Sequence, residues 1–215
     1  MNIIIFIINV LEYIDNWFRP EKYKNRKKVK LVKKSKSDKK EGKEILKRGK
    51  IGIELIDMPN ALDTKEVANQ LMQSNSHIGY FFHDSYCHQL AVKFEANSSM
   101  RFQVRNGSKR KQLEPLLAPE KKEVQDATHL IPVGYHGSEN DRRLLVGFDR
   151  KINRKYLKNF EDEIKEINKT KEILWFVNII KQKDNTVKWY AYIWDNKGNV
   201  IKQKMFHDKN KFKWK

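Results

Sequence analysis

The C-terminal part of the chain consists largely of three segments in which apolar and polar residues alternate. They cover residues 173–180, 187–194 and 200–206. The first connection contains Lys183-Asp184-Asn185 and the second is Asn196-Lys197-Gly198-Asn199. Alternation with a period of two is typical of strands, and short connections rich in Asn, Asp and Gly favour hairpins. This region is therefore predicted to be an antiparallel meander.

A single long helix is expected just before the meander, from about residue 149 to 168. Its apolar residues recur at three- and four-residue spacing, which places them on one face of a helix. They are Ile152, Tyr156, Phe160, Ile164 and Ile167. One face of this helix is expected to be buried.

Shorter elements are predicted upstream. Residues 63–66 (Asp-Thr-Lys-Glu) precede apolar positions with helical spacing and predict a short N-capped helix. Residues 78–82, 89–94 and 100–104 are predicted strands, with turns at 96–99 and 106–108. Together these elements predict an α+β fold built on an antiparallel sheet.

The first 75 residues divide into three parts. Residues 1–18 begin with a run of 11 mostly apolar residues, too short to span a membrane and without a basic region in front of it. We expect an amphipathic helix that docks on the domain or a partner, with interfacial membrane contact as the alternative. Residues 51–75 are a short helical lead-in to the main domain, 76–215.

Residues 19–50 form a basic linker or arm. They hold 16 Lys or Arg against 4 Asp or Glu, within a chain of formal charge +18. Such a run is either a solvated tether or an arm that contacts phosphates without reading sequence. Nucleic acid and anionic surfaces are the partners that this charge favours. The single cysteine, Cys87, excludes an intrachain disulfide and a four-cysteine zinc site.

The most informative motif is Asp126-Ala-Thr-His129-Leu-Ile-Pro, followed by the predicted helix with Asn153 and Glu161. It resembles the D-R-G-H element and the N-x7-E helix of the DNA/RNA non-specific endonuclease family. The resemblance covers about residues 100–206 and implies a ββα-metal (His-Me) finger. Ala127 and Thr128 replace the family's Arg and Gly, and the spacing from His129 to Asn153 is shorter than usual.

The resemblance implies roles that phosphodiester chemistry also requires. His129 is the expected general base, Asn153 the metal ligand and Glu161 a residue that hydrogen-bonds waters of the metal. Mg²⁺ is the expected metal, with Mn²⁺ as the alternative, because a hard cation that keeps most of its waters needs few protein ligands. Asn159 is a rival ligand, but it has no acidic residue eight positions later.

Developing negative charge on the phosphate also requires an arginine. Arg101 is the first choice as a catalytic residue. Arg105, which would share its strand face, and Arg142 and Arg143 in the finger loop are expected to bind substrate. His136, in the same loop, is expected on the substrate side or in solvent.

Two other patterns have structural interpretations. Residues 83–88, His-Asp-Ser-Tyr-Cys-His, have a spacing compatible with a metal site or a Cys-His pair, but Cys87 and His88 face opposite sides of a strand. The aromatic residues of the meander could stack bases, although strand alternation predicts that most of them lie in the core.

The sequence thus predicts a metal-dependent endonuclease with little sequence preference, acting on DNA and also on RNA. An inhibitor or immunity protein would be a partner if the chain is a toxin, and bacterial cytoplasm and secretion both remain open. The alternative is a non-catalytic protein of the same fold that binds nucleic acid or an anionic surface.

Overall fold

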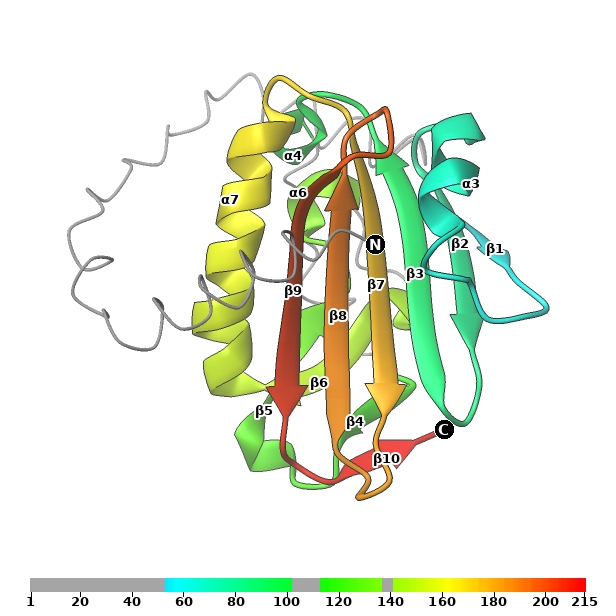
Figure 1. The fold of residues 1–215 in the computed structure, drawn as a ribbon. Coiled ribbons are helices and arrows are strands. Elements are labelled where there is room, and N and C mark those ends of the chain that lie inside the picture. The colour runs from blue at the N-terminus through cyan, green and yellow to red at the C-terminus, as the bar shows by residue number, and fades with distance from the viewer. Residues whose placement is uncertain (1–52, 102–112, 137–140) are drawn as a thin grey trace, which may run out of the picture. The chain divides into compact units, whose positions relative to one another are not determined.

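The computed structural model describes residues 53–101, 113–136 and 141–215, which all belong to the second of the two units of the chain, residues 35–215. This unit is a mixed α/β structure with one large, mostly antiparallel sheet and few helices (Figure 1). The expected apolar helix at 1–18 and the basic arm at 19–50 lie outside the described residues. Among the described helices, none is long and apolar enough to cross a membrane.

The large sheet has six strands in the order β1-β2-β3-β7-β8-β9. Its strands are β1 (Glu54–Asp57), β2 (Ile78–His83), β3 (Cys87–Phe94), β7 (Ile173–Lys181), β8 (Val187–Trp194) and β9 (Val200–Asp208). Only β1 and β2 pair in parallel; all other neighbours in this sheet are antiparallel.

The predicted meander is confirmed as β7, β8 and β9. Its two tight connections use residues that accept a positive φ, namely Asn185 at 62° and Gly198 at 79°. Such residues are favoured in short hairpin turns because the left-handed region costs Gly little and Asn only moderately. These turn residues therefore favour the two hairpins that connect the three strands.

Two small sheets and several helices make up the rest of the described residues. The antiparallel pairs are β4 (Leu117–Pro119) with β10 (Phe212–Trp214) and β5 (Gln125–His129) with β6 (Leu145–Asp149). The α-helices are α3 (Val67–Gln73), α4 (Ser98–Arg101), α6 (Val133–His136) and α7 (Lys158–Asn168). Shorter helical segments are η2 (Lys122–Val124), η3 (Arg142–Leu144) and the π-helical η4 (Ile152–Leu157).

The main core lies between one face of the large sheet and the elements that cover it. From the sheet, Trp175 and Trp189 point into this layer; from the other side, Phe148 of β6 and Phe160 of α7 meet them edge to face. This packing fixes β5, β6 and the helix on one side of the sheet.

The long predicted helix is confirmed as η4 continued by α7, and Phe160 and Ile164 of its predicted apolar face are buried. Tyr156 was wrongly placed on that face: it is exposed and Leu157 is buried instead, because the π-helical turns of η4 change the spacing.

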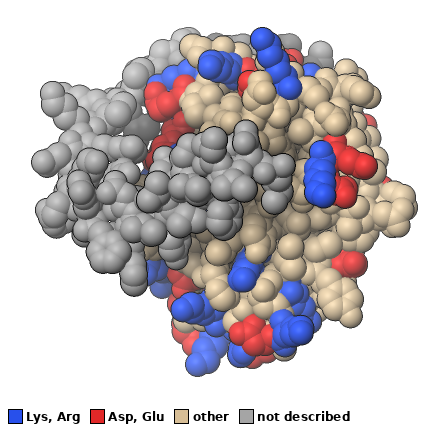
Figure 2. Space-filling view, viewed as in Figure 1, with Lys and Arg blue, Asp and Glu red and all other residues tan. Residues whose placement is uncertain are grey.

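The other face of the sheet carries α3 and a row of aromatic rings. Tyr192 stacks between Tyr190 and Trp194 on β8, at ring-centroid distances of 6.5 and 5.8 Å. Trp194 and Phe176 are buried, whereas the two tyrosines are half-buried. In the view of Figure 2, Lys and Arg are interspersed with Asp and Glu among the residues that the structure describes.

The strand predicted at 100–104 is wrong at its start, because residues 100 and 101 end the helix α4. The cause is tertiary. Asn168, buried at the end of α7, accepts a hydrogen bond from Ser99 N at 3.0 Å and donates one to Glu95 O at 2.9 Å. Asn97 has a φ of 66°, which turns the chain toward this anchor. Residues 102–104 lie outside the described part.

Candidate functional site

The candidate motif lies on three consecutive elements. β5 ends at His129 and pairs antiparallel with β6, and β6 runs directly into the helix of η4 and α7. Asp149 joins strand to helix, since its Oδ1 accepts from Ile152 N at 2.9 Å. Its own N–H donates to Oδ2 of the buried Asp208 at 2.7 Å, and burial raises the pKa of that carboxyl despite hydrogen bonds from Asn210.

Asp126 of β5 is the centre of an ion-pair cluster at the start of this helix. Arg154 binds it with two hydrogen bonds, Nε to Oδ2 at 2.7 Å and Nη2 to Oδ1 at 3.0 Å. Arg150 Nε reaches Oδ1 at 3.3 Å, and Asn153 Nδ2 reaches Oδ2 at 3.3 Å. Residues 150, 153 and 154 share one side of a helix, which explains why all three meet the same carboxylate.

This cluster sets the charge state of Asp126 and the orientation of Asn153. Partial burial by itself raises the pKa of Asp126, but hydrogen bonds from Arg154 and Asn153 and the charge of Arg154 outweigh it, so the pKa lies below its usual value. An ionised carboxylate only accepts hydrogen bonds. The Asn153 amide therefore turns its NH₂ group to Asp126 and its Oδ1 away from it.

His129 is 8% exposed and lies at the end of β5, opposite Leu145. Strand alternation directs its ring to the face opposite that of Asp126, because the two residues are three positions apart. After His129 the chain turns into α6, where the buried Tyr135 lies close enough to Glu161 for the glutamate charge to act on it. Burial is the main cause that raises the pKa of Tyr135, with Glu161 adding to it and a hydrogen bond from Ser99 opposing it.

The two candidate metal ligands have different environments. Asn153 is half-buried and contacts Asp126, whereas Asn159 is on the exposed side of α7. No group of three or more His, Cys, Asp or Glu side chains suited to a metal ion occurs in the described ranges.

The candidate arginines are separated in the fold. Arg101 is the last residue of α4, and Arg105 lies outside the described residues. Arg142 is exposed in η3. Arg143 is held by Asp141, through Nη2 to Oδ2 at 2.8 Å, and by Asp57 of β1, through Nη1 to Oδ1 at 2.6 Å. These contacts join the start of β6 to the edge of the large sheet.

His83 and His88 form a structural pair. His88 is fully buried, and burial is the main cause that lowers its pKa to about 3, so the ring is neutral. Its Nε2 donates to Arg143 O at 3.1 Å, which leaves Nδ1 to accept from His83 Nδ1 at 3.0 Å. The ring of His83 also stacks on Trp214. Burial, followed by the charge of Asp84, raises the pKa of Cys87 to about 12, so its thiol stays protonated at neutral pH.

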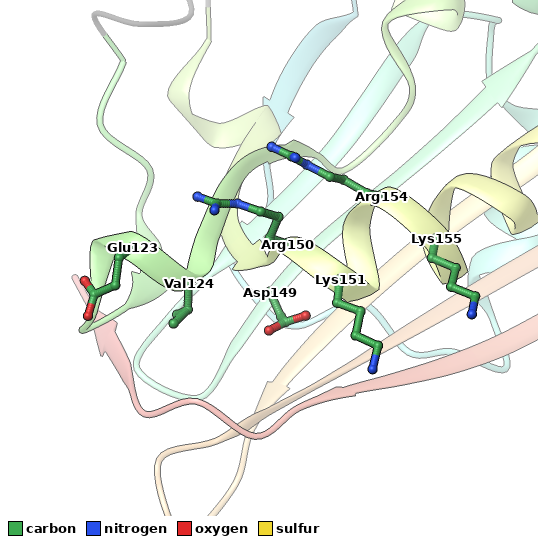
Figure 3. Close-up of a pocket in the computed structure, with 7 residues that line it drawn as sticks. All are labelled: Glu123, Val124, Asp149, Arg150, Lys151, Arg154 and Lys155. Carbon is green, nitrogen blue, oxygen red and sulfur yellow. The ribbon is translucent and has the colours of Figure 1, made fainter.

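A shallow open groove runs along the first turns of the helix. Its lining residues are Glu123, Val124, Asp149, Arg150, Lys151, Arg154 and Lys155. Figure 3 shows Arg150 and Arg154 extending together from one side of the helix, while Lys151 and Lys155 extend from another. The sequence analysis did not select these four cations. The sequence feature that could have identified them is a pair of basic dipeptides, Arg150-Lys151 and Arg154-Lys155, spaced one helical turn apart on either side of Asn153.

Comparison of the chain with protein families, with curated proteins and with solved structures gives no match.

Proposed function

We propose that the chain is a metal-dependent endonuclease that hydrolyses phosphodiester bonds of DNA, and of RNA as well, through a ββα-metal finger formed by β5, β6 and the helix that follows. One observation carries the proposal. Asp126, which begins the D-x-x-H motif, contacts Asn153, which begins the N-x7-E motif, although 26 residues separate them in sequence.

The orientation of Asn153 fits a hard cation. Its Oδ1 is an oxygen ligand of the kind that Mg²⁺ prefers, and Asp126 holds the amide so that this oxygen faces away from the carboxylate. Mn²⁺ accepts the same ligand. When bound there, the ion would relieve negative charge on the phosphate and on the leaving oxygen.

The remaining roles, proton transfer, water binding and positioning, would belong to protein side chains. His129 would accept a proton from the attacking water. Because strand alternation directs its ring away from the face of Asp126 and Asn153, this role requires the scissile phosphate to reach round the end of β5 from the Asn153 amide to the His129 ring. Glu161, on the next turns of the same helix, hydrogen-bonds water in the site. Asp126 holds Asn153 in position and is itself kept ionised by its arginines.

A plasmid-nicking assay tests the proposal. The full chain should nick supercoiled DNA with Mg²⁺ and stop when EDTA is added. His129→Ala should lower the rate by about 10²–10⁴-fold, as expected for loss of a general base, and leave DNA affinity in EDTA unchanged. His83→Ala is the matched control and should keep the rate. A His129→Ala protein that retains more than about a tenth of the rate would remove His129 from the mechanism.

The second candidate is a non-catalytic nucleic-acid binder. The four basic side chains of the helix groove favour it, since they suit phosphate binding without any chemistry. The same assay separates the two candidates. A pure binder retards DNA on a gel and produces no Mg²⁺-dependent nicks.

A further inference from the structure

Two arginines at the start of the helix share a single carboxylate. Arg154 is 65% exposed and Arg150 48%, whereas Asp126 beneath them is 19% exposed. One carboxylate balances only one of the two guanidinium charges. The cluster therefore keeps a net positive charge at the surface.

The hydrogen bonds to Asp126 fix the guanidinium groups without using all their donors. Arg154 binds through Nε and Nη2, and Arg150 through Nε, with Nη2 at 3.4 Å from Gln125 O. Within the described part of the chain, no group accepts a hydrogen bond from Nη1 of either arginine. Each guanidinium thus has one edge bound to the protein and the other available. Because Asp126 already holds these side chains in place, binding a ligand would cost little additional side-chain entropy.

The two lysines extend this charge along the groove. Lys151 and Lys155 follow the arginines by one position each and line the same groove (Figure 3). Lys155 Nζ also lies 5.4 Å from the ring centroid of the exposed Tyr156. Glu123 and Asp149 also line the groove and offset part of this positive charge; Asp149 accepts a hydrogen bond from the backbone N–H of Ile152.

We propose that Arg150 and Arg154 are a preformed clamp for a backbone phosphate of the nucleic acid, that Asp126 positions them, and that Lys151 and Lys155 contact adjacent phosphates. This inference rests on the proposed nucleic-acid substrate. Nucleic acid is preferred over a lipid surface because the proposed metal ligand Asn153 contacts the same carboxylate as the two arginines. Guanidinium edges bind phosphate oxygens in pairs, so the clamp fixes the register of the strand rather than its sequence.

The first test measures binding without cleavage. Fluorescence anisotropy of a labelled DNA duplex, in EDTA and over about 50–200 mM salt, gives the affinity and its salt dependence. Arg150→Gln/Arg154→Gln should weaken binding about 10-fold and reduce the slope of log K against log salt by about 2.

Two lysines further along the same helix provide the matched control. Lys158 and Lys169 are also paired with single carboxylates, Asp162 and Glu166, and lie outside the groove. Lys158→Gln/Lys169→Gln removes the same charge and should leave the DNA affinity and its salt dependence close to wild type. Equal effects of the two double variants would overturn the clamp, because net charge alone would then explain binding.

A second pair of variants isolates the positioning role of Asp126. Asp126→Asn and Asp57→Asn each remove one carboxylate that pairs with arginine. If net charge alone set the affinity, both variants would bind DNA more tightly, because each loses one negative charge. The clamp predicts weaker binding for Asp126→Asn only, since its arginines lose their anchor. Tighter binding by Asp126→Asn would overturn the positioning role.

Two further measurements, of vesicle binding and of nicking with Mg²⁺, distinguish this inference from its alternatives. If the arginine variant binds DNA normally but loses binding to phosphatidylserine vesicles, the clamp recognises a membrane and the inference is wrong. If the arginine variant loses DNA affinity while wild type fails to nick with Mg²⁺, the endonuclease proposal fails and the clamp stands. Thermal melts of each variant verify that the fold is kept.

Discussion

Two clusters of arginine and aspartate lie near opposite ends of the β5–β6 pair, and they have opposite compositions. At Arg143, one guanidinium serves two carboxylates, Asp57 and Asp141. At Asp126, one carboxylate serves two guanidiniums, Arg150 and Arg154. The first cluster uses up its cation to join chain segments, and the second leaves positive charge at the surface. The ratio of charges, more than the presence of an arginine, decides which cluster is available to a polyanion.

The arginine side chains of the two clusters also differ in solvent exposure. The Arg143 side chain is 28% exposed and lies over the ring of Phe81, and hydrogen bonds to Asp141 are the main cause that raises its pKa. Its main-chain oxygen also accepts from the buried His88. This cluster belongs to the framework that carries the candidate finger, so its loss should appear first in stability.

The largest expected effect lies in the Asp126 cluster. Asn153→Ala should raise the Mg²⁺ concentration for half-maximal nicking by about 10–100-fold, because loss of an inner ligand or of its support costs at least this much metal affinity. Asn159→Ala, on the exposed side of the helix, is the control. A shift confined to Asn159→Ala would move the ligand and break the N-x7-E assignment, while the nuclease proposal would remain.

Arg143→Ala should destabilise the fold by about 1–2 kcal/mol, because it leaves two carboxylates without their partner. Urea unfolding at neutral pH measures this. Arg154→Ala should leave the urea midpoint unchanged, since its side chain is largely exposed and a single carboxylate remains with Arg150. A larger loss from Arg154→Ala than from Arg143→Ala would reverse the assignment of framework and binding cluster.

The framework cluster should also be sensitive to acid through His88. The unfolded chain protonates this residue near pH 6.5, but the native state does so only near pH 3. The stability that His88 contributes is therefore fully present above pH 6.5 and is lost as the pH falls toward 3. Between pH 7 and pH 5 we expect a loss of about 2 kcal/mol in urea unfolding. His88→Gln should flatten this dependence; an unchanged slope would place the titrating group elsewhere.

The smallest expected effect is that of Arg143 on DNA. Because both of its carboxylates remain within 2.8 Å, Arg143→Gln should change DNA affinity by less than about twofold once stability is allowed for. Anisotropy in EDTA measures it. A loss equal to that of the Arg150/Arg154 variant would show that the Arg143 cation is available to phosphate after all.

Several features of this protein followed from local sequence alone. Period-two alternation and the turn residues Asn185 and Gly198 specify the meander, because strand pairing and a positive φ are short-range requirements. Three- and four-residue spacing of apolar side chains specifies the long helix for the same reason.

Tertiary structure alone decided the rest. The short strands β1, β4 and β10 were not predicted, since strands of three or four residues have too little pattern and exist only because a partner strand pairs with them. Residues 100 and 101 are helical because Asn168, far along the chain, anchors the segment beside them. Above all, the sequence does not reveal which carboxylates each arginine binds in the folded chain. The contact of Arg143 with Asp57, 86 positions earlier in the chain, gives Arg143 a second aspartate. The contacts with Asp126 make Arg150 and Arg154 share one carboxylate, and this ratio sets which charge remains for a ligand.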